Sequence, residues 1–338
     1  METRRLAEIA KAVGLGDSPD ATLACDVAAL GFVSHEEPTT LLADVLRWQG
    51  SVLRDRGQTS DAQPLYDQSL RVAEHLGYDL GRAHALNCLG SLAQRRGDIG
   101  GASNYFSEAL AIAEPFGEVR LVGMLQQNLG IVADIRGNPA AALAHYLVAL
   151  KTFERCNDEQ SASWALSNLG YLHAREERFE EARAAYGRAL RIASERGDLL
   201  TEGVVQENCG ELELIVGDLA AAIPCVRRAL SISEQRHDTV RRAAALKLLG
   251  AYQRLSGQPD RAQQTLSHAL TLSAVGEDAL VGAELLYQFG ATIWDLGDES
   301  LARDVLNTAL EAFERIGARR WSGRVKKRLS EGVSGRYL

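Results

Sequence analysis

The chain reads Ala165-Leu166-Ser167-Asn168-Leu169-Gly170-Tyr171-Leu172, a segment whose glycine returns at a fixed spacing of 40 residues. Seven glycines share this register: Gly50, Gly90, Gly130, Gly170, Gly210, Gly250 and Gly290. Alanine follows twelve residues after each of them, and leucine follows twenty residues after each. A repeat that keeps its length through seven copies predicts a stack of similar structural units, each in contact with its neighbours.

Each unit is predicted to fold as two helices joined by a turn. Around Gly170 the apolar residues recur every three or four positions, and the second half of the unit repeats that spacing with Ala182, Tyr186 and Ala189. The repeat glycine is expected to let two helices approach closely. Large side chains are expected to fill the space beside it: Tyr66, Phe106, Tyr146 and Tyr186. The predicted fold class is therefore an all-α solenoid.

The turn between the two helices has its own signal. In six units a second glycine stands seven residues after the first, where a chain leaving a helix favours a left-handed residue: Gly57, Gly97, Gly137, Gly217, Gly257 and Gly297. The following residue is a predicted helix N-cap in four units: Asp98, Asn138, Asp218 and Asp298. Glu177 replaces the turn glycine in the fourth unit, which costs about 1 kcal/mol if Glu177 is left-handed.

This pattern resembles the tetratricopeptide repeat, and the resemblance covers roughly residues 38–317. The 40-residue unit is most similar to the repeats of kinesin light chain, of LGN-type scaffolds and of bacterial regulators with tetratricopeptide sensor regions. The resemblance implies a right-handed α-solenoid of seven units. Residues 1–37 are expected to form a degenerate capping repeat, and residues 318–338 a basic capping helix and tail.

Composition and motifs argue against several classes of protein. No apolar stretch approaches the roughly 20 residues that a membrane-spanning helix needs. The five cysteines lack the paired spacing of a disulfide framework or a zinc site, and we expect mostly buried thiols. The common hydrolase, metalloprotease and phosphate-loop motifs are absent. We therefore predict a cytoplasmic protein that is not an enzyme and uses no cofactor or metal; its Arg-Gly-Asp and Arg-Gly-Asn turns indicate a bacterial source.

A peptide-binding face is implied by the resemblance. In that family the first helix of each unit lines a concave groove, and asparagines two residues before the repeat glycine bond the main chain of an extended peptide. Asn128, Asn168 and Asn208 occupy that register in three consecutive units. An amide both donates and accepts, which suits recognition of a main chain. The alternative is that these amides cap or bridge neighbouring helices.

Other side chains of the same face complete the predicted site. They are Gln127, Ile131, Trp164, Tyr171, Arg175, Glu207 and Glu211. Trp164 and Tyr171 are the candidates for dominant contacts, because exposed aromatic rings supply much of the energy of such interfaces. Packing between repeats is the alternative role for both rings.

Charge gives weaker information about partners. The face carries both signs, so it implies no ligand of a single charge. Eight basic residues lie near the C-terminus against Glu331: Arg315, Arg319, Arg320, Arg324, Lys326, Lys327, Arg328 and Arg336. Trp321 and Leu329 in this segment favour a capping helix over a nucleic-acid surface. The predicted function is a scaffold that binds a protein or peptide in its groove; the alternative is a peptide- or ligand-sensing regulator of a transcription or signalling partner.

Overall fold

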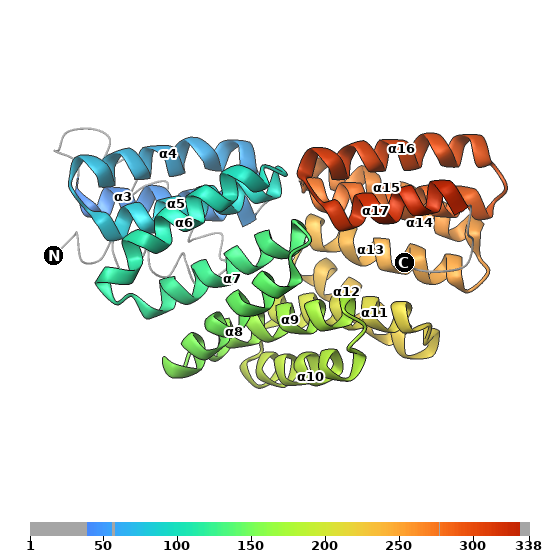
Figure 1. The fold of residues 1–338 in the computed structure, drawn as a ribbon, viewed down its shortest axis with the longest axis horizontal. Helices are drawn as coiled ribbons and strands as arrows, with labels where there is room; N and C mark the ends of the chain where they lie inside the picture. The colour runs from blue at the N-terminus through green and yellow to red at the C-terminus, as the bar shows by residue number, and fades with distance from the viewer. Residues whose placement is uncertain (1–38, 56–57, 277, 332–338) are drawn as a thin grey trace. The chain divides into compact units, whose positions relative to one another are not determined.

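The computed structural model describes residues 39–55, 58–276 and 278–331. These residues form fifteen α-helices, α3 to α17, with a short 3-10 helix, η1, and contain no strand (Figure 1). The predicted capping repeat at residues 1–37 lies outside them. The all-α prediction is confirmed, and the helix pairs run from Thr40 to Ile316.

The chain divides into two compact units, with the boundary inside α7. The first unit contains residues 1–94 and 100–125. Its described helices are α3 (Thr40–Asp55), α4 (Thr59–His75), α5 (Asp79–Arg95), α6 (Ile99–Ala113), η1 (Glu114–Phe116) and the start of α7 (Val119–Ile135). In its core Tyr66 of α4 is fully buried against Leu89 and Leu92 of α5.

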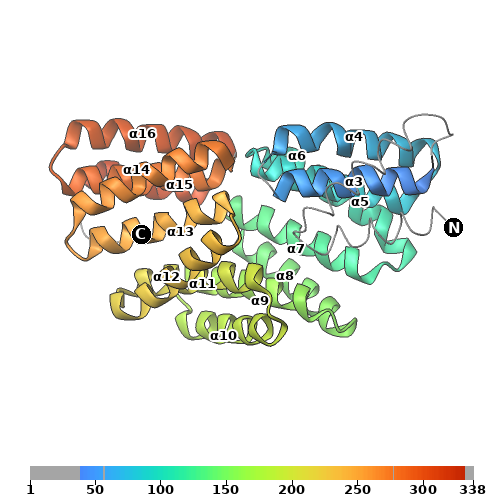
Figure 2. The same ribbon diagram turned by 180° about the vertical axis from the view of Figure 1, so that it is seen from behind.

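The second unit contains residues 95–99 and 126–338. Its remaining helices are α8 (Pro139–Arg155), α9 (Glu159–Arg175), α10 (Phe179–Arg196), α11 (Leu199–Val216), α12 (Leu219–Gln235), α13 (Thr239–Leu255), α14 (Pro259–Gly276), α15 (Ala279–Asp295), α16 (Glu299–Ile316) and α17 (Arg319–Glu331). The first helices α9, α11, α13 and α15 each pack on the second helix of their pair, as α13 does on α14 (Figure 2). The first helices α9, α11, α13 and α15 also pack on one another in sequence order. This arrangement is an α-solenoid.

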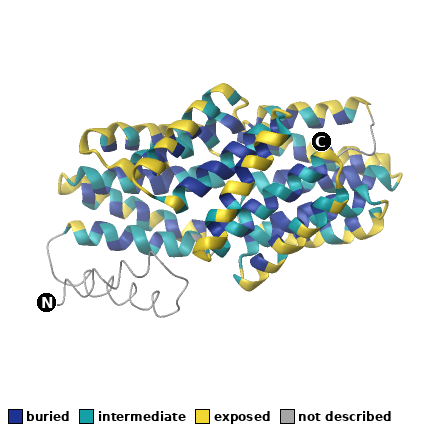
Figure 3. Ribbon diagram, turned by 90° about the horizontal axis from the view of Figure 1, so that it is seen from below, coloured by how far each residue is buried: buried dark blue, intermediate teal, exposed yellow. Residues whose placement is uncertain are grey.

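The repeat glycines explain how closely the paired helices approach. A Cβ atom added at Gly170 would lie 2.5 Å from the ring of Tyr186, and one at Gly130 would lie 2.5 Å from the ring of Tyr146. The prediction that glycine makes room for the large side chain sixteen residues later is confirmed. Figure 3 shows buried residues in dark blue and exposed residues in yellow recurring along the helices, as expected when one side of each helix faces the core.

The turns inside the pairs also follow the prediction. Gly97, Gly137, Gly217, Gly257 and Gly297 have φ between 75° and 91°. Glu177 has φ 60°, so this residue carries the strain that the sequence predicted. Left-handed residues also end the second helices, as at Asn157 and His237, both with φ 53°. The sequence analysis did not identify these turns between units.

Capping side chains fix where the helices begin. Asn138, Asp218 and Asp298 accept hydrogen bonds from main-chain N–H groups three residues later, as predicted. Aspartates also cap four first helices, which the sequence analysis overlooked: Asp158, Asp198, Asp238 and Asp278. Each of these aspartates precedes a first helix of the second unit. The start of a first helix and the start of a second helix are thus both fixed by a capping side chain.

Candidate partner-binding face

We use the term first-helix face for the predicted binding residues on α7, α9 and α11. Each of these residues belongs to the second unit, which includes α7 from Gln126 onward. The residues of α7 are Gln127, Asn128 and Ile131. Those of α9 are Trp164, Asn168, Tyr171 and Arg175, and those of α11 are Glu207, Asn208 and Glu211. Arg175 and Glu207 are buried, and the other residues are partly exposed. Because α9 packs on α11, their contributions form one surface.

The three asparagines have different surroundings. Asn208 donates a 2.9 Å hydrogen bond from Nδ2 to Ser167 Oγ, so its amide links α11 to α9. Asn128 also interacts with other groups of the chain. Among the described residues the Nδ2 atom of Asn168 is buried and has no hydrogen-bond partner. The structure thus places Asn208 in a contact between helices and leaves one unsatisfied donor at Asn168.

Tyr171 and Arg175 form one cluster on α9. The guanidinium of Arg175 lies over the Tyr171 ring, 5.1 Å from its centroid, and Nη1 lies 3.4 Å from the phenol oxygen. Burial raises the pKa of the Tyr171 phenol well above its ordinary value, against the opposing effect of Arg175. Trp164 stands seven residues before Tyr171, about two helical turns away, and is partly exposed.

Arg175 is committed to an ion pair that the sequence analysis did not identify. It donates from Nη1 to Asp134 Oδ2 of α7 at 2.6 Å, and both side chains are less than 10 % exposed. Burial acts to lower the pKa of Arg175, but Tyr171 and Asp134 outweigh it and raise that pKa. Burial raises the pKa of Asp134, with Arg175 opposing the shift. Arg175 is therefore a cation held in place by its neighbours.

Further ion pairs join the first helices of the second unit. Arg254 of α13 pairs with Asp295 of α15 at 3.1 Å, and Lys247 of α13 pairs with Glu284 of α15. Asp134–Arg175 and Arg254–Asp295 share the same separation of 41 residues. That offset between opposite charges is visible in the sequence and could have predicted both contacts. The charges of these six side chains are thus paired with one another within the chain.

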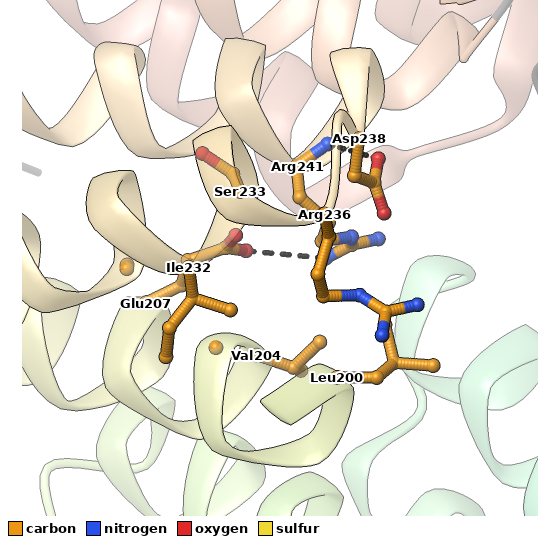
Figure 4. A pocket seen from close by; sticks show the side chains of 10 residues that line it. Leu200, Val204, Glu207, Ile232, Ser233, Arg236, Asp238 and Arg241 are labelled. Carbon is orange, nitrogen blue, oxygen red and sulfur yellow. Dashed lines mark hydrogen bonds and ion pairs between the residues drawn. The ribbon is translucent and has the colours of Figure 1, made fainter. Parts of the chain in front are cut away.

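A small recess adjoins the first-helix face at Glu207 (Figure 4). Its enclosed space is about 10 Å³, which holds no more than one water molecule, and its apolar lining comes from Leu200, Val204 and Ile232. Glu207 pairs with Arg241 of α13 at 3.1 Å. Burial raises the pKa of the Glu207 carboxyl to about 7, against the opposing effect of Arg241 and Lys247.

Comparison with known proteins places these features in a family. A model described as tetratricopeptide repeat matches five overlapping segments, residues 41–114, 82–155, 119–195, 161–235 and 203–274. The chain belongs to the tetratricopeptide repeat family. The tetratricopeptide repeat is a protein-interaction fold. No curated protein sequence matches the chain at a significant level.

Solved structures with this fold resemble the chain over nearly its whole length. A Rap protein complexed with Competence and Sporulation Factor has a TM-score of 0.66 at 14 % identity, with 98 % of each chain covered. NprR in complex with its cognate peptide NprX has a TM-score of 0.65 at 12 % identity, covering 96 % of this chain and 98 % of NprR. Aspartyl phosphate phosphatase F from Bacillus subtilis has a TM-score of 0.61 at 11 % identity, covering 99 % and 96 %.

Other kinds of site were sought in the part of the chain that the structure describes. There, no group of three or more His, Cys, Asp or Glu side chains could hold a metal ion, and no helix is long and apolar enough to cross a bilayer. Cys88 is buried, Cys209 and Cys225 are partly buried, and Cys156 is exposed. Cys156, which follows the end of α8, is thus the exposed one of these four thiols, and Cys25 lies outside the described residues.

Proposed function

We propose that this tetratricopeptide repeat chain is a non-catalytic binding module that holds an extended segment of a partner polypeptide on its first-helix face. The partner lies along α7, α9 and α11, with its main chain opposite the asparagine register. The module acts without a cofactor in the cytoplasm of a bacterium, in signalling. Neither nucleic acid nor a membrane is part of this proposal.

The unsatisfied amide of Asn168 is the observation that carries the proposal. Leaving a buried donor without a partner costs about 1–3 kcal/mol, so such groups are uncommon in folded proteins. Asn168 Nδ2 is such a donor within the described structure, and it lies at the centre of the predicted asparagine register. To bond this buried atom, a carbonyl oxygen of a bound main chain must displace the side chains that cover it, and it then supplies the acceptor that Nδ2 lacks.

Two aromatic rings on the same helix support a polypeptide ligand. Trp164 and Tyr171 stand four residues before and three residues after Asn168, on one side of α9, and both are partly exposed. A ring beside a main-chain hydrogen bond gives a partner side chain an apolar surface.

The experiment starts from peptides selected against the purified protein from a displayed random 12-residue library. Titration of one selected peptide should show about a tenfold loss of affinity for Asn168→Ala, as expected for one buried hydrogen bond. Trp164→Ala should lose at least about thirtyfold, as expected for a dominant contact. Asn307→Ala, on the exposed side of α16, is the matched control. Wild-type affinity in both test variants, with unchanged helicity, would remove the proposal.

A peptide-sensing regulator is the second candidate function. The Rap and NprR structures named above each contain a peptide or signalling factor, and both share this fold. One observation in this chain favours it: Arg175 belongs both to the predicted binding face and to an ion pair between α7 and α9. A ligand that moves Arg175 would also loosen that pair. X-ray scattering with and without a selected peptide measures whether the dimensions of the protein change on binding. Identical profiles would argue against a peptide-sensing regulator and leave the scaffold function.

A further inference from the structure

Helix α17 is anchored to the last helix pair by the ring of Trp321, by Arg328, whose guanidinium lies 5.7 Å from the centroid of the Tyr287 ring, and by one exposed ion pair. Trp321 stacks on Phe313 of α16 with ring centroids 5.3 Å apart, and its edge meets Tyr287 of α15 at 5.9 Å. Lys326 pairs with Glu314 of α16 at 2.8 Å. Trp321 and Val325 are buried. The backbone position of α17 is therefore fixed by contacts that do not involve the first-helix face.

Arg320, beside the anchoring Trp321, contacts the end of α9. Its Nη2 donates to the carbonyl oxygen of Arg175, and its Nη1 pairs with Glu176 at 3.2 Å. Arg175 is the last residue of α9, so its carbonyl has no partner within the helix and lies at the negative end of the helix dipole. A carbonyl and a carboxylate at a helix C-terminus together form a site for a cation with several donors.

Arg324 adds a second guanidinium from α17. It lies over the Trp321 ring at 4.8 Å and is partly buried. Burial lowers its pKa, as does the nearby charge of Arg175, whereas Tyr171 and Glu211 favour the charged form. Arg320 thus contacts the Arg175 carbonyl, and Arg324 lies close enough to Tyr171, Arg175 and Glu211 of the predicted binding face to feel their charges.

We infer that the C-terminal end of α9 is a guanidinium site that receives an arginine of the partner segment, and that Arg320 occupies it when no partner is bound. The Arg175 carbonyl and the Glu176 carboxylate are its acceptors, and Glu211 of α11 adds negative charge nearby. This inference rests on the proposed function, since it names the chemistry of the segment that the first-helix face takes. The partner is a basic, arginine-containing polypeptide.

Arginine fits the site better than lysine because its planar guanidinium can donate to the carbonyl and the carboxylate at once. Exchange requires little rearrangement. Arg320 and Glu176 are both partly exposed, with 29 % and 37 % of their side chains accessible, so the Arg320 side chain can leave while Trp321 keeps α17 in place. An arginine of the partner then makes the same contacts with the Arg175 carbonyl and the Glu176 carboxylate that Arg320 made before.

The test uses fluorescein-labelled nona-arginine as the probe and fluorescence anisotropy in about 150 mM salt, where long-range attraction is screened. Arg320→Ala should bind the probe at least fivefold more tightly than the wild type, because the internal competitor is gone. Arg319→Ala is the matched control, since it removes the same charge one residue away from an exposed position. Equal gains in Arg320→Ala and Arg319→Ala would overturn the inference.

Two further measurements make the result specific. Adding Glu176→Gln to Arg320→Ala should abolish the gain, and nona-lysine should show a smaller gain than nona-arginine. Arg320→Gln repeats the test if the alanine variant loses its wild-type helicity. The outcome is separable from that of the proposed function: if the library-selected peptides depend on Asn168 while Arg320 variants change nothing, the binding face stands and the guanidinium site falls. If the selected peptides do not depend on Asn168 while Arg320→Ala still binds the probe more tightly, the guanidinium site stands and the proposed binding face falls.

Discussion

Asp134 of α7 accepts a 2.6 Å hydrogen bond from Arg175 of α9, 41 residues later, and both side chains are buried. Arg254 and Asp295 repeat this separation between α13 and α15 with the charges exchanged. Two pairs of neighbouring first helices are thus joined by an ion pair at the same 41-residue offset, buried in one case and partly buried in the other. Since each unit of a solenoid contacts only its neighbours, such pairs help to set how successive units pack.

Removing one member of the Asp134–Arg175 pair should therefore destabilise the second unit strongly. Asp134→Ala leaves the buried Arg175 guanidinium without its carboxylate, and we expect a loss of about 3–5 kcal/mol in the free energy of unfolding. Urea denaturation followed by circular dichroism measures it. Glu154→Ala, which breaks the exposed pair with Arg188, is the control and should cost less than about 1 kcal/mol. Equal losses in the two variants would contradict a buried, committed ion pair.

The carboxyl of Glu207 should make stability depend on pH. Its pKa is raised from 4.5 to about 7 by burial, so the folded state binds a proton more tightly than the unfolded state. The stability from this proton is present below pH 4.5 and is lost as the pH rises through 7. Relative to Glu207→Gln, the wild type should lose up to about 3 kcal/mol over that range.

Urea denaturation of both proteins at several pH values between 4.5 and 7.5 checks this sign. Glu181→Gln, at an exposed position of α10, controls for the loss of one carboxylate. A constant difference between wild type and Glu207→Gln across the range would show that Glu207 keeps an ordinary pKa, and a wild type that gains stability with pH would reverse the argument.

Two glycines of one helix pair should respond in opposite directions to alanine. Gly170→Ala places a Cβ 2.5 Å from the Tyr186 ring, and overpacking of this kind costs about 1–3 kcal/mol. Gly187→Ala, in α10, meets nothing within 4 Å, so it should stabilise the helix by about 0.5–1 kcal/mol. Thermal unfolding of the two variants measures both effects, and a melting temperature that moves in the same direction in both would contradict the packing role of Gly170.

The sequence predicted the parts of this fold that depend on one residue and its local chemistry. The repeat glycines, the turn glycines and several capping residues could be found because each has a fixed place in the 40-residue unit. The turns at Asn157 and His237 were missed because neither residue has the glycine signal of a left-handed position. Their backbone is held by local hydrogen bonds at the helix ends, in which Asp158 N–H donates to the Phe153 carbonyl and Asp238 N–H to the Ser233 carbonyl.

The binding face was less predictable than the fold. The resemblance placed Asn168 and Asn208 at equivalent positions, yet Asn208 donates to Ser167 while Asn168 Nδ2 has no partner in the described structure. The difference depends on the neighbouring unit and not on the register. Arg320 could not be assigned from sequence either, because its contact with Glu176 spans 144 residues. Such distant contacts follow from the stacking of many units together.

The turn at Glu177 allows a last prediction, in which stability is gained. Glu177 has φ 60° where five other described units have glycine, and a non-glycine residue is strained in that conformation. Its side chain is exposed, so removing it sacrifices little packing. Glu177→Gly should raise the free energy of unfolding by about 1 kcal/mol, the conformational strain that glycine avoids. Gly217→Ala, at φ 88° in the next unit, is the reciprocal change and should lower it by a similar amount. Denaturation midpoints of the two variants test the pair together, and a destabilised Glu177→Gly would mean that the side chain makes a contact that outweighs the strain.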